Sequence, residues 1–365
     1  MTDPTFEPIE RAWTPSSKLY TDPGTYSEVL EKVFARSWQW VGDDRLVKVP
    51  GQVSPLTLLE GSLDEPIVLT RDTQDALHCL SNVCTHRGML VCEAGGNERF
   101  LRCRYHGRRF GLDGRFQDMP EFEAAENFPS ESDHLSRVPM ARWRSHLFAG
   151  VAPAIGFEEW ISPVQERVSW MPIESFFHEP SRQKDYFVSA NWALYVDNYL
   201  EGFHIPFIHN ALAGTLDYGN YRTELFAGGN LQLGVAKAGE PCFDLPPDSP
   251  DFGERIGAYY FWLFPNLMLN FYPWGLSINV VKPLGPSKTK VSFIQYVGDP
   301  SKLDDGAGSG LDRVEREDEA VVEAVQRGLR SRFYDRGRYS PTRETGTHQF
   351  HQLLLRSLAS SESGR

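Results

Sequence analysis

The chain has 365 residues, 41% hydrophobic and 24% charged, which allows two domains with hydrophobic cores of their own. A formal net charge of −12 argues against nucleic acid as the main partner. No apolar run approaches the length of a membrane span, and the first residues do not resemble a signal peptide, so we expect a cytoplasmic protein without a membrane partner.

An arm and a series of short strands are predicted for the first part of the chain. In the arm, residues 1–45, the spacing of apolar residues predicts a helix from Ser27 to Ser37. Apolar or alternating runs predict strands at 66–70, 76–80 and 100–103, with hairpin turns at 95–97 and 113–114. We therefore expect an all-β domain over residues 46–155.

Two loops of this domain carry a Cys-x-His pair and, after sixteen intervening residues, a Cys-x2-His pair. Two thiolates and two imidazoles are the ligand set of a Rieske [2Fe-2S] centre. A glycine follows each pair, where the backbone must turn tightly and its amides can approach the cluster sulfurs. The predicted cluster ligands are Cys84, His86, Cys103 and His106.

A structural zinc site is the competing interpretation of these four residues. Zinc sites of this composition usually pair like ligands, whereas each loop here supplies one Cys and one His. The odd cysteine count argues against a disulfide framework, and we expect Cys79, Cys92 and Cys242 to be buried small hydrophobic residues. A zinc-stabilised binding protein and a simple Rieske electron carrier remain as alternatives to an enzyme.

The second domain, residues 156–365, is predicted to be mixed. Long apolar runs at 258–264, 276–281 and 290–296 favour an antiparallel sheet with helices on one face. Another helix is expected to begin near Glu315 and to reach Leu329. The predicted fold class is therefore α+β.

A second group of metal-binding residue types lies at the start of this domain. His204 and His209 are five residues apart and would lie on different faces of an uninterrupted helix. Pro206 interrupts the helix between them, so both imidazoles can converge on one ion. Two His and one carboxylate would leave open positions on Fe(II), and the carboxylate must come from elsewhere in the chain.

A basic cluster surrounds the second cluster loop. It is either a solvated, salt-bridged face or a docking patch for an acidic electron carrier or an adjacent subunit. Its members are Arg99, Arg102, Arg104, Arg108 and Arg109.

Together these motifs resemble the large (alpha) subunit of Rieske non-haem iron oxygenases, and the resemblance extends over nearly the whole chain. It implies a catalytic domain of the helix-grip (START-like) type. Relatives commonly carry Trp after His-Gly, whereas Arg108 follows His106-Gly107 here. The stretches 199–206 and 337–344 resemble the branch that includes choline and glycine-betaine oxygenases.

The resemblance also implies roles for particular residues. The segment from Glu315 matches the family segment that supplies the carboxylate ligand, which places that ligand at Asp318, with Glu317 as the fallback. Glu201 is implied to bridge the iron site and a Rieske histidine of the neighbouring subunit, and Asn198 is the other implied catalytic residue.

The implied reaction is activation of O2, the co-substrate, at a mononuclear Fe(II) to hydroxylate, dihydroxylate or demethylate a small organic substrate. Electrons would come from an NAD(P)H-dependent flavin/iron–sulfur reductase, with or without a ferredoxin, and the chain is implied to form a homotrimer. A quaternary-amine monooxygenase and an aromatic-ring dioxygenase both stay open. Pocket candidates are residues from strands that would face the iron: Phe261, Phe264, Asn270, Tyr272, Trp274 and Asn279.

Overall fold

The computed structural model describes residues 3–209, 212–303 and 305–360. Two compact units make up the chain: a smaller unit, Ala35–Phe157, and a larger unit of Met1–Phe34 with Glu158–Arg365. Residues 3–34 thus belong to the larger unit. Among the described helices, none is long and apolar enough to cross a membrane.

The smaller unit consists of three antiparallel sheets. Their strand orders are β1 (Gln39–Asp43), β10 (His146–Ala149), β9 (Met140–Trp143); β4 (Leu77–Ser81), β3 (Glu65–Arg71), β2 (Gln52–Leu58), β5 (Gly96–Asn97); and β6 (Leu101–Arg102), β7 (Arg109–Phe110), β8 (Phe116–Asp118). The expected all-β character is confirmed. The turn expected at 95–97 is wrong, because Gly96 and Asn97 pair with Val53 and Gln52 as a short strand.

The larger unit is built on one antiparallel sheet. Its strands follow the order β11 (Phe177–His178), β18 (Lys288–Val297), β17 (Gly275–Gly285), β16 (Leu267–Tyr272), β15 (Ile256–Leu263), β14 (Gly229–Val235), β13 (Arg222–Phe226). A further strand, β12 (Lys184–Val188), also pairs with β18. Every residue of β15 and β16 is buried, because both faces of the sheet are covered. The expected α+β class is confirmed.

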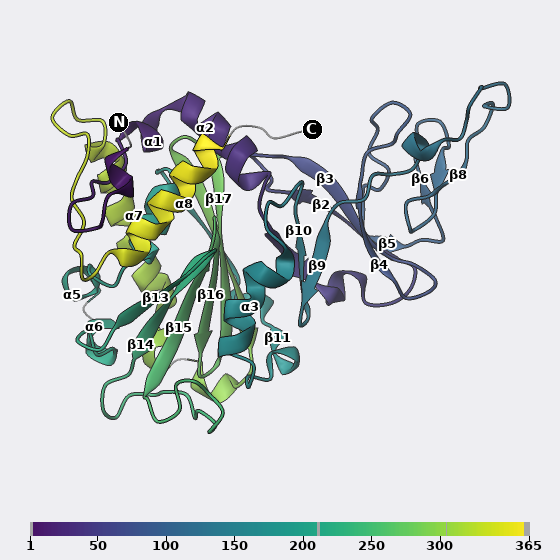
Figure 1. Cartoon of the computed structure of the whole chain (residues 1–365). Helices are drawn as coiled ribbons and strands as arrows, with labels where there is room; N and C mark the ends of the chain where they lie inside the picture. Colours follow the sequence, from purple (N-terminus) through teal and green to yellow (C-terminus); the bar gives the residue numbers. More distant parts are fainter. Residues whose placement is uncertain (1–2, 210–211, 304, 361–365) are drawn as a thin grey trace. The chain divides into compact units, whose positions relative to one another are not determined.

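The helices of this unit are α1 (Lys18–Thr21), α2 (Pro23–Val29), α3 (Phe157–Arg167), α4 (Trp192–Tyr199), α5 (Ile205–Ile208), α6 (Leu212–Thr215), α7 (Leu311–Gly328) and α8 (Thr345–Ala359). Figure 1 shows α8, in yellow, lying across the strands, where it contacts β13 and β14. Helix α4 contacts both β17 and α7. The helix expected from Ser27 to Ser37 begins earlier, as α2, and continues through a π-helical turn that ends at Phe34.

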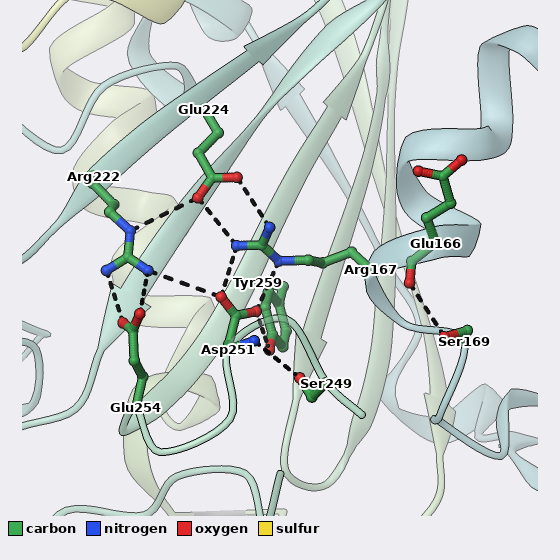
Figure 2. Close-up of polar contacts among 9 residues, drawn as sticks. All are labelled: Glu166, Arg167, Ser169, Arg222, Glu224, Ser249, Asp251, Glu254 and Tyr259. Carbon is green, nitrogen blue, oxygen red and sulfur yellow. Dashed lines mark hydrogen bonds and ion pairs between the residues drawn. The ribbon is translucent and has the colours of Figure 1, made fainter. Parts of the chain in front are cut away.

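A network of charged side chains ties α3 to the sheet (Figure 2). Arg167 donates to Asp251 through Nε (2.7 Å) and Nη2 (2.8 Å) and also to Glu224, while the Tyr259 hydroxyl donates to Asp251 at 2.8 Å. Asp251 is almost fully buried, so these donors compensate the cost of removing its charge from water. The network holds the C-terminal end of α3 against β13 and β15.

Candidate functional site

The helix that carries the first candidate site residues is interrupted before the two histidines. Asn191 caps α4 by accepting the Ala193 N–H at 3.0 Å, and the helix ends at Tyr199. A new turn, α5, starts after His204 with Pro206 near its N-terminus, and His209 follows its last residue. The expectation that Pro206 interrupts a helix between the two histidines is wrong, because the interruption lies before His204 and Pro206 stands in the first turn of α5, where it needs no partner for a backbone N–H.

His204, His209 and Asp318 converge on one point. One ligand atom from each lies within 4.8 Å of the others. Oδ1 of Asp318 is 3.0 Å from Nε2 of His209 and 3.6 Å from Nε2 of His204. Two imidazole nitrogens and one carboxylate oxygen are the donor set of the facial triads that hold Fe(II), so the residues present fit a mononuclear iron.

A carboxylate also lies behind each imidazole. Nδ1 of His204 is 2.7 Å from Oε1 of Glu201, and Nδ1 of His209 is 2.7 Å from Oε2 of Glu317. Such contacts fix the tautomer that leaves Nε2 free to bind a metal. Glu317, the fallback ligand, thus supports His209 from the side opposite to Asp318.

The charges at this point favour a bound cation. Burial on its own would lower the pKa of His209, but its hydrogen bonds and electrostatic interactions with Asp318 and Glu317 raise it. Asn198 donates to Oδ1 of Asp318 at 2.6 Å and orients that carboxylate. Asn198 therefore acts on the triad through Asp318.

A cavity opens beside the triad and is lined by one face of the sheet. Gln232, Tyr260 and Asn270 are neighbours in one row across β14, β15 and β16, and Asn279 is paired with Phe293 across β17 and β18. The helices contribute the rest of the wall. The aromatic side chains around the cavity are Tyr195, Tyr199, Tyr221, Tyr260, Tyr272 and Phe293.

Half of the six pocket candidates line this cavity: Asn270, Tyr272 and Asn279. The placement of Phe261, Phe264 and Trp274 in the pocket is corrected, because none of the three is among the described lining residues. Successive side chains of a strand point to opposite faces, so Tyr260 faces the cavity and Phe261 packs against Phe271 on the other face. Trp274 stacks on Tyr272 from outside the cavity, at 5.2 Å between ring centroids.

Several lining residues were not predicted. Tyr199 donates to Oδ1 of Asn270 at 2.6 Å, and Tyr221 donates to Oε1 of Gln232 at 3.0 Å. Tyr195 and Tyr199 stand in the same segment as Asn198, at helical spacing, and this spacing could have identified them. Nothing local marks Tyr221, Gln232 or Phe293, because strand pairing places them.

The two cluster loops in the smaller unit have the same backbone design. Gly88 donates to the carbonyl of Cys84, and Gly107 donates to that of Cys103, both at 3.0 Å. Both glycines have positive φ, 71° and 76°, a conformation that side chains disfavour. The tight glycine turns expected after the two Cys–His pairs are therefore present.

The side chains of these loops also fit the cluster. Cys84 and Cys103 are buried, and burial raises the pKa of Cys84, with the neighbouring Cys103 adding to the shift. The rings of His86 and His106 lie 4.8 Å apart and are partly exposed. The donor set is two buried thiols and two partly exposed imidazoles, which fits a Rieske [2Fe-2S] centre.

Arg108 does not belong to an exposed docking patch. It is 2% exposed, its Nη2 lies 2.5 Å from Oδ1 of Asp133, and its guanidinium lies over three rings, those of Phe110, Phe116 and Phe128. Arg109, by contrast, is partly exposed and pairs with Asp118. Of the two adjacent arginines, only Arg109 can reach a partner.

Cys79 and Cys92 are buried as expected, whereas Cys242 is only partly buried.

Two family models match the chain. One, described as the Rieske [2Fe-2S] domain, matches residues 37–129, and the other, described as the ring hydroxylating alpha subunit (catalytic domain), matches residues 178–360. The chain therefore belongs to the Rieske oxygenases of the ring-hydroxylating alpha-subunit family. It is an enzyme that carries a Rieske [2Fe-2S] cluster and a mononuclear iron, uses O2 and requires a reductase.

Individual relatives and a solved structure agree with this assignment. The chain is 34% identical to the chloroplastic choline monooxygenase of Arabidopsis thaliana over 96% of this chain and 84% of that protein. It is 29% identical to the carnitine monooxygenase oxygenase subunit of Escherichia coli (strain K12) over 94% of both. A solved quaternary ammonium Rieske monooxygenase, whose structure concerns carnitine oxidation and inter-subunit electron transfer, has the same fold, with a TM-score of 0.76 and 24% identity over 94% of this chain and 95% of that one.

Proposed function

We propose that His204, His209 and Asp318 hold the mononuclear iron, and that Cys84, Cys103 and the two loop histidines, His86 and His106, hold the cluster. The convergence of two Nε2 atoms and one Oδ1 supports the first assignment. When bound, the iron supplies open coordination positions at which O2 is activated beside the substrate. Glu201, Glu317 and Asn198 then orient the three ligands.

Iron content tests this assignment directly. Asp318→Ala should lose the mononuclear iron and keep the visible spectrum of the Rieske cluster, because the two donor sets share no residue. Glu319→Ala, which removes a charge from the next position of the same helix, is the control and should keep all the iron. An Asp318→Ala protein with its full iron content would refute the ligand assignment.

For the substrate we propose a small quaternary or tertiary ammonium compound. Aromatic rings surround the cavity, and ring faces attract organic cations with about 0.5–2 kcal/mol each. Three acids and no Lys or Arg are found among the described lining residues. An anionic aromatic acid, one form of the aromatic substrates that the sequence left open, would meet no Lys or Arg among the described lining residues.

The residues that line the cavity also distinguish between two kinds of ammonium compound. Carnitine and glycine betaine bear a carboxylate, which would need a cationic partner, whereas choline bears a hydroxyl that Asn270, Asn279 or Gln232 could bind. The absence of Lys and Arg from the described lining carries the proposal. We therefore place choline-like compounds, without a carboxylate, first.

Oxygen consumption tests the substrate proposal. The enzyme, reduced through a generic reductase, is offered choline, glycine betaine, carnitine and an aromatic carboxylic acid. We expect substrate-dependent oxygen uptake coupled to product with choline, and little with the others. Coupled turnover of the aromatic acid alone would refute it.

We further propose that the chain works as a homotrimer in which one subunit's cluster reduces the next subunit's iron, with electrons from an NAD(P)H-dependent flavin/iron–sulfur reductase, with or without a ferredoxin. The solved relative's inter-subunit electron transfer supports this. Within this chain, Phe203 and Phe207 next to the triad are 40% and 74% exposed, an apolar surface that assembly would bury. Light scattering should give three times the chain mass, and a fully active monomer would contradict the proposal.

Glu201 is the proposed link between the subunits. Its Oε1 contacts His204, and its other oxygen accepts the N–H of His204 at 3.0 Å. Glu201→Gln should keep cluster and iron yet nearly abolish turnover, with the cluster still reduced at the normal rate by the reductase. Full activity of this variant would exclude the bridge.

A further inference from the structure

Helices α4 and α7 face each other through two matched pairs of side chains. Asn198 donates to Asp318, and three residues earlier on both helices Tyr195 donates to Oε2 of Glu315 at 2.6 Å. Residues three apart share a helix face, so Glu315 stands one turn before the iron ligand and on the same side. The pair formed by Asp318 serves the metal, whereas the triad uses neither Tyr195 nor Glu315.

Glu315 lies in the wall of the cavity. The residues of α7 that line it, Leu311, Val314, Glu315 and Asp318, follow the spacing of a single helix face. Glu315 is 3% exposed, and its Oε1 is buried without a hydrogen-bond partner among the described residues. A buried oxygen without a partner destabilises the fold, and a ligand in the cavity that engages this oxygen would remove the cost.

Among the described residues, those whose charges act on Glu315 are acids. The acids that act on it are Asp318, Glu319 and Asp312, all on α7, and on α4 it faces the hydroxyl of Tyr195. The strands contribute neutral groups to the cavity, such as Asn270 and Asn279. Burial, with these acids adding to it and Tyr195 opposing it, raises the pKa of Glu315 to about 8. The side chain therefore holds a proton at neutral pH while the cavity is empty.

We propose that Glu315 is the counter-ion that selects a cationic substrate, an inference that rests on the ammonium substrate proposed above. The ammonium group occupies the cavity between the aromatic rings and Glu315, and its positive charge replaces the proton on the carboxyl group. That proton leaves to the solvent when the substrate binds. Tyr195 keeps its bond to Oε2 and so holds Oε1 toward the ligand. Glu315 is a specificity-determining residue that takes no part in the oxygen chemistry.

Binding to the holoenzyme tests this, with two probes of one shape and different charge. They are choline and its uncharged isostere, in which a tert-butyl group replaces trimethylammonium. Glu315→Gln should weaken choline binding by more than about tenfold and leave the isostere within about twofold, because only the charged partner loses its counter-ion. Glu319→Gln, a matched loss of charge off the cavity wall, should change neither affinity.

Calorimetry in two buffers of different ionisation enthalpy provides a second, independent measurement. At pH 7 the native enzyme should release a proton as choline binds and none as the isostere binds, and Glu315→Gln should abolish the release. If Glu315→Gln does not fold, the native enzyme alone decides, since choline binding without proton release overturns the proposal.

Other outcomes also count against it. Equal weakening of both probes in Glu315→Gln would show that the residue only maintains the shape of the cavity. Unchanged choline affinity would overturn the counter-ion role while leaving the substrate proposal intact. Failure of the native enzyme to bind any ammonium compound would refute the substrate proposal itself, and Glu315 with it, before any variant is made.

Discussion

Oε2 of Glu317 lies 2.7 Å from Nδ1 of His209, the ring nitrogen opposite to the one that faces Asp318. Two adjacent residues of α7, Glu317 and Asp318, thus contact the two nitrogens of the His209 ring. Asp318 faces Nε2 of the ring and Glu317 faces Nδ1, although both are carboxylates of adjacent residues. The arrangement assigns different tasks to two residues that the sequence could not separate by chemistry alone.

Removal of the supporting carboxylate should weaken the iron site without removing a ligand. Glu317→Ala is expected to lower iron affinity or turnover about 10–100-fold, since such partners orient the ligand and increase its basicity. A chelator competition on the holoenzyme measures the affinity, and Glu319→Ala is the matched control. Unaltered affinity in Glu317→Ala would mean that His209 is held by packing alone.

The buried arginine of the smaller unit should be needed for its stability. Arg108→Ala leaves Asp133 without its main partner and empties the space between three rings, which we expect to cost about 3–5 kcal/mol. Arg109→Ala removes an adjacent but partly exposed arginine and should cost about 0–1 kcal/mol. Loss of the cluster's visible absorption during denaturant unfolding reports both, and equal midpoints for the two variants would contradict the prediction.

The charge network of Figure 2 allows a similar comparison between a buried and an exposed residue in the larger unit. Asp251→Asn leaves the guanidinium of Arg167, 16% exposed, without its buried partner, so we expect a loss of about 3–5 kcal/mol. Glu254→Gln breaks the exposed end of the network at Arg222 and should cost about 0–1 kcal/mol. Thermal unfolding of the two variants beside the native protein distinguishes them, and a Glu254→Gln protein as unstable as Asp251→Asn would argue against burial as the cause.

Acid should destabilise the smaller unit through His146. Burial lowers the pKa of His146 to about 4, with Asp43 opposing the shift, whereas in the unfolded chain it titrates near 6.5. Between about pH 6.5 and 4 the unfolded chain therefore binds a proton that the native one does not, so the free energy of unfolding falls as pH falls, by about 3 kcal/mol at most.

Unfolding curves measured across this pH range test the role of His146. His146→Leu should flatten the pH dependence, while His178→Gln, a change at a partly exposed histidine of the larger unit, should leave it unchanged. A steep acid transition that persists in His146→Leu would assign it to other groups.

Much of the chemistry could be read from local sequence. The cluster ligands are two residues apart in one loop and three in the other, and the turn after each requires only a glycine with positive φ. The break in the helix was predicted at the wrong place, because Pro206 stands in the first turn of α5 between the two histidines and α4 already ends at Tyr199. Asp318 could not be identified from local spacing, because several acids lie near the start of α7. Only the family resemblance distinguished it from Glu317.

The cavity wall was predicted less well, and Phe261 shows why. Four consecutive aromatic residues, 259–262, stand in β15 without a charged residue to mark the outer face, so the sequence could not tell whether Tyr260 or Phe261 faces the site. Pairing with Gln232 on one side and Asn270 on the other decides it. A shift of one residue in that register would exchange the two faces.

By itself the sequence determined the two metal-binding motifs and the α+β class, because these follow from residue types and their spacing, and its resemblance to a known family implied the class of enzyme. Only the tertiary structure decided that Glu317 contacts Nδ1 of His209, which tyrosines surround the cavity, that Arg108 is buried, and that Glu315 stands one turn before Asp318. These facts depend on strand register, on side-chain packing around Arg108 and, near the triad, on contacts between residues more than a hundred positions apart, which local spacing does not encode.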